Sequence, residues 1–199
     1  MKLLVATNNL HKLEEYRSLL EGLPVALRSL RDEGIDMEVE ETGSTFEDNA
    51  SIKARTYASL SGLLTVADDS GLEVASLGDE PGVYSSRYAG PGADDEQRTK
   101  YLLAKMKDIP WEQREARFRC IIAIAQPGRD LLLCEGRCDG IIALEPRGEN
   151  GFGYDPVFYL PDLGLTMAEL PPSRKNAISH RAMAARKARL ILLEVLSEV

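Results

Sequence analysis

The sequence predicts an α/β or α+β fold, because strand-like apolar runs alternate with stretches of helical periodicity. The run at 2–7 has the length of a buried strand, and apolar residues recur at helical spacing over 10–21. The runs 118–125 and 131–134 predict a hairpin, whose antiparallel strands argue against a purely parallel sheet. With 199 residues the chain can form one sizeable core or two lobes that share a sheet, so we expect one compact unit over residues 1–199.

The first strand leads directly into the first helix, and the second helix has clear start and stop signals. Ser44 or Thr45 can accept hydrogen bonds from the free amides at its N-terminus. Glu47 or Asp48, three residues further on, can complete a capping box. We expect this helix to end before Gly62.

The remaining elements follow in order along the chain. The run 63–67 predicts a second buried strand, and the charge-rich segment 94–107 predicts a third helix. The two hairpin strands come next, joined by residues 126–130. Residues 179–198 predict a final helix, because small and apolar residues fall on one of its faces. These residues are Ala182, Ala185, Ala188, Leu192 and Val195.

The chain is acidic, with 32 acidic and 24 basic residues and a formal net charge of −8. Binding along a nucleic-acid backbone needs a broad positive surface, so we expect no nucleic-acid partner. A small anionic substrate is compatible with this charge if local cations or a bound metal overcome the overall repulsion.

The sequence indicates a cytoplasmic protein with no membrane partner. The N-terminal apolar run is too short for a signal peptide, and no stretch approaches the length of a membrane-spanning helix. The three cysteines, Cys120, Cys134 and Cys138, form an odd set far from both histidines, which argues against a zinc site or a disulfide scaffold. Cys120 lies in an apolar run, where a small buried side chain is expected.

The first polar cluster lies between the first strand and the first helix. Free amides and the positive end of the helix can hold phosphate there, and Lys12 adds a full charge. The segment is not a Walker A loop, which needs more glycines and a Lys-Ser/Thr pair. In the alternative interpretation, Asn9 only caps the helix and Lys12 is solvated. The cluster consists of Thr7, Asn8, Asn9, Leu10, His11 and Lys12.

A second cluster is acidic and precedes the second helix. Glu38, Glu40 and Glu41 lead into a turn, and the following helix presents Glu47, Asp48 and Asn49. Magnesium needs only one or two protein carboxylates, since water and substrate phosphate complete its shell, so Glu41 is a candidate ligand. The alternative is a solvated acidic face that the helix dipole favours.

The third cluster places Asp68 and Asp69 at the end of the second strand, before Ser70 and Gly71. This order predicts a sharp acidic turn. Consecutive side chains in a strand point to opposite faces, so both acids reach one metal ion only if the backbone turns between them. We expect Asp69 to face the site and Asp68 to orient a neighbour. The alternative is an ordinary turn.

Two further segments suggest a nucleotide pocket. In the glycine-rich loop 148–156, a base can stack on Phe152 or Tyr154, a contact worth about 1–3 kcal/mol per base; alternatively, these rings fill the core. In the basic segment 173–181, Lys175 and Arg181 can meet phosphate or a base edge. The alternative for segment 173–181 is a basic surface turn.

Six segments in order resemble one known family. Each segment is common by itself, but six in this order are specific, and they span the chain from about residue 3 to the last helix. The segments are Thr7 to Lys12, ETGSTFEDNA at 41–50, ADDSGL at 67–72, PGVYSSRY at 81–88, GFGYDP at 151–156 and SHR at 179–181. Together they resemble the inosine/xanthosine triphosphate pyrophosphatases, the Ham1 or non-canonical purine NTP pyrophosphatase family.

The resemblance implies a two-lobed α/β protein with a long mixed central sheet flanked by helices, a substrate cleft between the lobes, and a homodimer. It also implies magnesium-dependent hydrolysis of ITP, dITP or XTP to the monophosphate and pyrophosphate. In the family this reaction removes deaminated purines from the nucleotide pool.

The matched segments also imply the site residues. The metal ligands are implied at Glu41 and Asp69, but Glu40 beside Glu41 leaves the identity of the second ligand open. Asp69 is also the implied catalytic base. Asn8 stands where many family members carry glycine, which affects how closely the loop can approach phosphate. Substrate contacts are implied at Thr7, Asn8, Asn9, Lys12, Lys53, Ser70, Phe152, Gly153, Tyr154, Asp155, Lys175, His180 and Arg181.

Base selection is expected at the 6-position of the purine. A donor such as Arg181, or a backbone amide, would pair with the carbonyl of hypoxanthine or xanthine but meet the amino group of adenine unpaired. Two alternatives stay open. One is a related magnesium-dependent hydrolase for other modified nucleotides, and the other is a nucleotide-binding regulator without catalysis.

Overall fold

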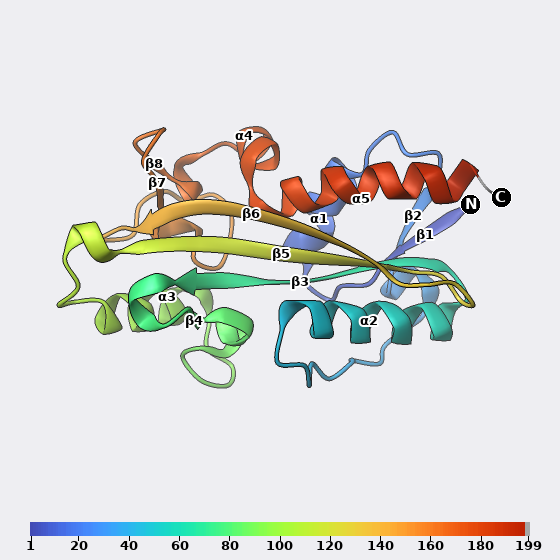
Figure 1. Ribbon diagram of the computed structural model, residues 1–199, viewed down its shortest axis with the longest axis horizontal. Coiled ribbons are helices and arrows are strands. Elements are labelled where there is room, and N and C mark those ends of the chain that lie inside the picture. Colours follow the sequence, from blue (N-terminus) through green and yellow to red (C-terminus); the bar gives the residue numbers. More distant parts are fainter. Residues whose placement is uncertain (198–199) are drawn as a thin grey trace. The chain divides into compact units, whose positions relative to one another are not determined.

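An eight-stranded mixed sheet flanked by helices is the frame of the protein (Figure 1). It is seen in a computed structural model, which describes residues 1–197. The strands are hydrogen-bonded in the order β2-β1-β3-β5-β6-β7-β8, and β4 pairs with β3 beside this path. Their bounds are β1 Lys2–Val5, β2 Ala26–Ser29, β3 Leu64–Val74, β4 Glu80–Pro81, β5 Glu115–Ala125, β6 Leu132–Ile142, β7 Phe158–Leu160 and β8 Leu165–Thr166.

Parallel and antiparallel pairs occur in this one sheet. β1 runs parallel to β2 and β3, whereas the pairs β3–β4, β6–β7 and β7–β8 are antiparallel. β5 and β6 are neighbours joined by residues 126–131, a connection too short for a crossover, so they form the predicted hairpin. The prediction of an α/β fold with a mixed sheet is confirmed.

Four of the α-helices lie where the sequence predicts them. The predicted last helix extended to Glu198, which lies outside the described residues. The fourth helix, α4, was missed, because its two prolines suggest a break although proline is well tolerated in a first helical turn. The helices are α1 Leu10–Leu19, α2 Phe46–Ser61, α3 Asp95–Lys105, α4 Pro172–Ile178 and α5 His180–Ser197. The short strands β2, β4, β7 and β8 were also missed, because so few residues show no periodicity.

The helix caps explain where the helices begin and end. The Asn9 side chain accepts a hydrogen bond from the Lys12 amide at the start of α1. At the start of α2, the Thr45 side chain accepts from the Asp48 amide. Gly62 ends α2 with a φ of 70°, a conformation that glycine adopts without a steric cost.

The predicted acidic turn at Asp68 and Asp69 is wrong. β3 continues from Leu64 to Val74, so both acids and Gly71 lie within a strand. The apolar residues on both sides of the acids are buried, and an extended backbone keeps its amides and carbonyls in the sheet. The tertiary structure therefore overrides the local turn tendency of the Asp-Asp-Ser-Gly sequence.

The residue contacts divide the chain into two compact units. Unit 1 consists of Met1–Asp69, Cys120–Gly136 and the chain from Arg181 on. Unit 2 consists of Ser70–Arg119 and Arg137–His180. Each unit holds part of β3, β5 and β6. The substrate cleft between two lobes stays a prediction.

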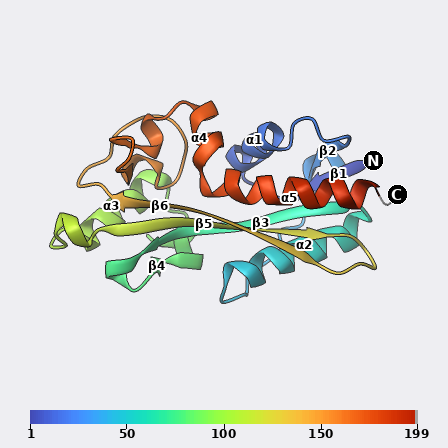
Figure 2. The ribbon, with the colours of Figure 1, turned by 45° about the horizontal axis from the view of Figure 1, so that its top comes forward.

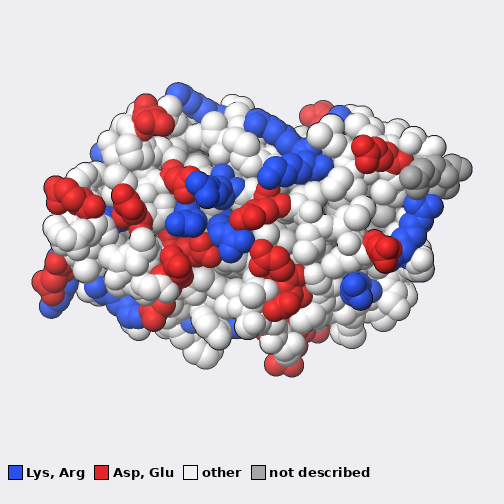
Figure 3. Space-filling view, viewed as in Figure 1, with Lys and Arg blue, Asp and Glu red and all other residues white. Residues whose placement is uncertain are grey.

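Acidic and basic side chains are intermixed over the surface in the view of Figure 3. The described part of the chain contains no helix with the length and apolar character needed to cross a bilayer.

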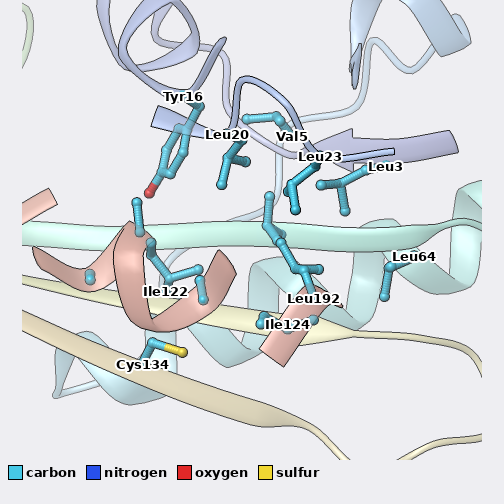
Figure 4. Packing of buried hydrophobic residues seen from close by; sticks show 14 of the residues in the cluster. Leu3, Val5, Tyr16, Leu20, Leu23, Leu64, Ile122, Ile124, Cys134 and Leu192 are labelled. Carbon is cyan, nitrogen blue, oxygen red and sulfur yellow. The ribbon is translucent and has the colours of Figure 1, made fainter. Parts of the chain in front are cut away.

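In unit 1, α1 and α5 lie on one face of the strands and α2 lies on the other (Figures 1 and 2). Figure 4 shows the core between β1, β3, β5 and the helices, to which Val5, Ile122 and Leu192 belong. Cys120 belongs to this core and is fully buried, as predicted. Burial raises the pKa of its thiol to about 12, so it behaves as a small apolar side chain.

Unit 2 has its own core, and a buried arginine ties its edge together. Arg114 is 2% exposed, and its guanidinium donates to four backbone carbonyls. The acceptors are Met106 at 2.7 Å, Ile109 at 3.2 Å, Ile142 at 2.7 Å and Ala143 at 3.0 Å. The chain after α3 is thereby joined to the end of β6.

We predict that Arg114→Ala lowers the free energy of unfolding by about 3 kcal/mol or more, because four carbonyls, three of them in buried contacts, lose a charged donor. Urea denaturation measures the change. Arg117→Ala is the control, because the Arg117 side chain is 44% exposed and lies 3.9 Å from its carboxylate partner, so its loss should stay within about 0.5 kcal/mol. Equal losses in the two variants would show that the carbonyl contacts are not stabilising.

Candidate active site

The loop after β1 is shaped by its own side chains. The Thr7 hydroxyl accepts from the Asn9 amide at 3.1 Å, and the Asn9 side chain accepts from the Lys12 amide at 3.1 Å. Asn9 therefore caps α1. Lys12 is not a solvated surface residue, because its Nζ lies 3.0 Å from Oδ2 of Asp68 and its side chain is 16% exposed. Asn8 is exposed beside them.

The strand conformation of β3 sends Asp68 and Asp69 to opposite faces of the sheet. Asp68 faces α1 and α5, where it meets Lys12 and Arg181. Nε and Nη2 of Arg181 each lie 3.4 Å from Oδ2 of Asp68, and Nη1 lies 2.6 Å from Oε2 of Glu15. Two cations, of which Arg181 is fully buried, and two carboxylates therefore balance one another.

This setting keeps Asp68 charged. Burial acts to raise its pKa, but the positive charges of Lys12 and Arg181 outweigh burial and hold the pKa well below the usual value. The expectation that Asp68 supports a neighbour fits these contacts. Arg181 is buried in the same network, and its guanidinium forms ion pairs with Asp68 and Glu15.

Asp69 faces α2 instead. The Asn49 side-chain amide donates to Oδ2 of Asp69 at 3.0 Å. Lys53 Nζ lies 3.9 Å from Oδ1 of Asp69 and is also hydrogen-bonded to Glu41. Asp69, Lys53 and Glu41 therefore form one cluster in unit 1, and the predicted residue Glu41, rather than exposed Glu40, makes the contact.

The electrostatics of this cluster differ from those around Asp68. Burial raises the pKa of Asp69, and the negative charge of Glu41 opposes ionisation further, although Lys53 acts in the other direction. Burial alone would lower the pKa of Lys53, but Asp69 and Glu41 raise it above the usual value. The pKa values of both groups can be raised because Lys53 lies between two acids, whereas Asp69 is buried with one cation and one acid beside it.

Asn49 was not predicted as a site residue, yet it connects the two acidic segments. It is fully buried. Its Oδ1 accepts from the Gly43 amide at 2.8 Å while its amide holds Asp69. A Cβ on Gly43 would lie 2.7 Å from this oxygen, so the turn after Glu41 requires glycine. The segment ETGSTFEDNA contained this residue, but no local pattern shows where its side chain points.

The acids of this cluster fit a magnesium ion. Within residues 1–197 there is no group of three or more histidine, cysteine or acidic side chains arranged to hold a metal. Magnesium needs only one or two protein carboxylates, which Glu41 and Asp69 can supply. The raised pKa of Asp69 shows a carboxylate that a nearby cation would stabilise.

In unit 2, the glycine-rich loop is built around a buried ion pair. Asp155 Oδ2 accepts from Lys175 Nζ at 2.5 Å and from the Phe152 amide at 2.9 Å. A Cβ on Gly151 would overlap this carboxylate, so the loop can close only with glycine there. Lys175 Nζ also lies 4.5 Å from the centre of the Phe152 ring. Lys175, predicted as a phosphate or base contact, is therefore buried within the loop structure.

Three other predicted residues of unit 2 have different settings. Tyr154 is a core residue whose hydroxyl donates to the Ser85 carbonyl at 2.9 Å, so the alternative in which this ring fills the core is confirmed for it. His180 is buried and stacked on Phe118, with ring centres 4.7 Å apart. Ser70 is half-buried in β3. Half-buried Phe152 remains the aromatic candidate for base stacking.

We predict that Asp68→Asn lowers the free energy of unfolding much more than Asp69→Asn does. Asp68→Asn leaves Lys12 and Arg181 without a buried anion and should cost about 3–5 kcal/mol. Asp69→Asn removes a carboxylate whose charge Glu41 opposes, and should change stability by less than about 1 kcal/mol. Chemical denaturation of the two variants measures both effects at pH 7.

The pH dependence of this difference has a definite sign. The folded-state pKa of Asp68 lies below the unfolded value of about 3.9, so its stabilisation is fully present above that pH and is lost as the pH falls. The difference in the free energy of unfolding between wild type and Asp68→Asn should therefore shrink below about pH 4. A gap that is constant down to acid unfolding would contradict the charge assignment.

Comparisons with known proteins agree with one another. A family model described as the Ham1 family matches residues 3–190. The chain is 48% identical over 191 residues to a dITP/XTP pyrophosphatase of Bacillus licheniformis, which covers 96% of this chain and 97% of that relative. It is 49% identical over 183 residues to one of Geobacter sulfurreducens, over 92% of each chain. A solved HAM1 protein from Coxiella burnetii matches with a TM-score of 0.89 at 44% identity, over 98% of this chain and 99% of that chain.

Proposed function

The chain belongs to the Ham1 family, and we propose that it is a nucleoside-triphosphate pyrophosphatase for non-canonical purine nucleotides. Its substrates would be dITP, XTP and ITP, split into the monophosphate and pyrophosphate. The names of the relatives support dITP and XTP. The observation that carries the proposal is the cluster of Asp69, Lys53 and Glu41, in which a buried carboxylate is held beside a cation and a second acid.

Asp69 is the proposed base of the reaction. The Asn49 amide holds its carboxylate in a fixed orientation, as a general base requires. Asp69 would orient the water that attacks the α-phosphorus and take its proton. Lys12 and Lys53 would stabilise the departing pyrophosphate, together with amides of the loop after β1.

We propose magnesium as the cofactor, held by Glu41 and Asp69. Bound there, the ion would neutralise phosphate charge that otherwise repels the attacking water. Lys53 contacts both proposed ligands, so it stabilises their shared negative charge.

The base is proposed to stack on Phe152 and to be selected at its 6-position. Of the two donors considered for the 6-carbonyl, the Arg181 guanidinium is held by Asp68 and Glu15, which favours a backbone amide. The resemblance further supports a homodimer that acts on the cytoplasmic nucleotide pool.

A panel of triphosphates tests the reaction. With magnesium, we expect the purified protein to release pyrophosphate from dITP, XTP and ITP, and to turn over dATP at least about 100-fold more slowly, because an unpaired donor meets the adenine amino group. Chromatography that separates pyrophosphate from orthophosphate is the measurement. Orthophosphate as the product would mean cleavage at the γ-phosphate. Fast turnover of other modified nucleotides would favour the related hydrolase.

Asp69→Asn tests the proposed base. We expect kcat for dITP to fall by about 1,000-fold or more, because both the proton acceptor and a magnesium ligand are altered, while the melting temperature stays near that of wild type. Arg55→Ala, an exposed position on the same helix as Lys53, is the control and should keep full activity. A protein that binds dITP and melts at a higher temperature without consuming it would be a regulator instead.

A further inference from the structure

The loop that carries Phe152 is held at two consecutive backbone amides. The Phe152 amide donates to Asp155 Oδ2 at 2.9 Å, and the Gly153 amide donates to Asp95 Oδ2 at 2.6 Å. These two amides flank the Cα of Phe152, so together they restrict both backbone dihedrals that direct its ring. Asp155 belongs to the loop itself, whereas Asp95 is 58 residues away in sequence, at the first position of α3.

Asp95 is itself held in place. The Arg98 guanidinium contacts the other oxygen of Asp95, and it also donates to the carbonyls of Ser86, at 3.0 Å, and Ala93. Arg98 is thus fixed by the two segments that precede α3, and it presents Asp95 to the loop. The Thr99 hydroxyl adds a weaker contact of 3.5 Å to the Gly153 carbonyl. The N-terminal half of α3 therefore holds the Gly153 residue on both its amide and its carbonyl side.

The loop needs such an anchor because it is rich in glycine. Gly148, Gly151 and Gly153 all have positive φ, with φ of 64° at Gly153. Glycine loses more conformational freedom on ordering than any other residue, so an unanchored loop would have to be ordered by the ligand. A loop that is ordered beforehand binds its ligand without that cost.

Asp95 differs in this respect from its neighbour Asp94. Asp94 is the N-cap of α3, where its side chain accepts from the Gln97 amide at 2.8 Å and the Gln97 side chain accepts from the Asp94 amide at 3.0 Å. Asp94 therefore stabilises the helix, and Asp95 connects the helix to the loop. The sequence motifs singled out neither residue.

We propose that Asp95 is a positioning residue for base selection. By fixing the peptide between Phe152 and Gly153, it sets the place of the Phe152 ring against the purine, without touching the substrate itself. This inference rests on the proposed function, in which Phe152 contacts the base.

Asp95→Ala and Asp94→Ala are a matched pair for the test. We expect Asp95→Ala to lower kcat/KM for dITP by about tenfold, mainly through KM, because a charged hydrogen bond to the loop is lost. The value for dATP should hardly change, so the dITP to dATP ratio also falls about tenfold. Asp94→Ala should lower the melting temperature by about 2–4 °C through loss of the cap and leave the ratio unchanged.

Asp95→Asn separates the role of the acceptor from that of the charge. Asparagine can still accept from the Gly153 amide, so Asp95→Asn should restore most of the wild-type ratio of kcat/KM for dITP to that for dATP. Hydrogen exchange of the peptide over residues 151–155 gives a readout without turnover. Exchange there should speed up in Asp95→Ala, and stay at the wild-type rate in Asp94→Ala.

The outcomes are distinguishable. A reduced ratio together with faster exchange in Asp95→Ala alone supports the proposal. If wild type releases pyrophosphate from dITP and Asp95→Ala has the wild-type ratio, the proposal is overturned and the proposed function stands. If wild type releases no pyrophosphate from any triphosphate, both are overturned.

Discussion

The alternation of side chains along β3 is the constraint on which the proposed chemistry depends. Because the strand does not turn at Asp68 and Asp69, the two carboxylates are forced to opposite faces of the sheet and meet different surroundings. Asp68 meets two cations and stays ionised, while Asp69 meets a cation, an amide and a second acid. One acid can therefore serve the structure while its neighbour is available for chemistry.

The buried charges around Asp68 are tolerable only as a set. An isolated carboxylate in an apolar core would be very costly, and so would an isolated guanidinium. Lys12 comes from α1 and Arg181 from α5, so each helix brings a cation to the strand, and Glu15 balances the second cation. The same contacts that neutralise Asp68 thus fix both helices against β3. This explains why charged side chains lie beside the apolar core of unit 1.

The sequence predicted the long helices and the hairpin well, because each is marked by periodicity or by local caps such as Asn9 and Thr45. It failed at β3, where Asp-Asp-Ser-Gly has the local character of a turn. Arg181, one of the two cations that stabilise Asp68 in the strand, is 113 residues away, and no local pattern contains that information. The choice between Glu40 and Glu41 was left open for the same reason, since it depends on where Lys53 and Asn49 lie.

The supporting residues are harder to predict than those expected to touch the substrate. Asn49 and Asp95 both lie near the start of a helix, where polar side chains normally cap the helix or face solvent. Asp94 does cap α3, whereas Asp95 is the same residue type one position later and binds the glycine-rich loop. Local chemistry is identical for the two, and only a long-range contact separates their roles. The residues of an active site must be held to within about 0.5 Å of their working positions. Supporting residues such as Asn49 and Asp95 provide this precision, but a sequence motif does not distinguish them from ordinary residues at a helix start.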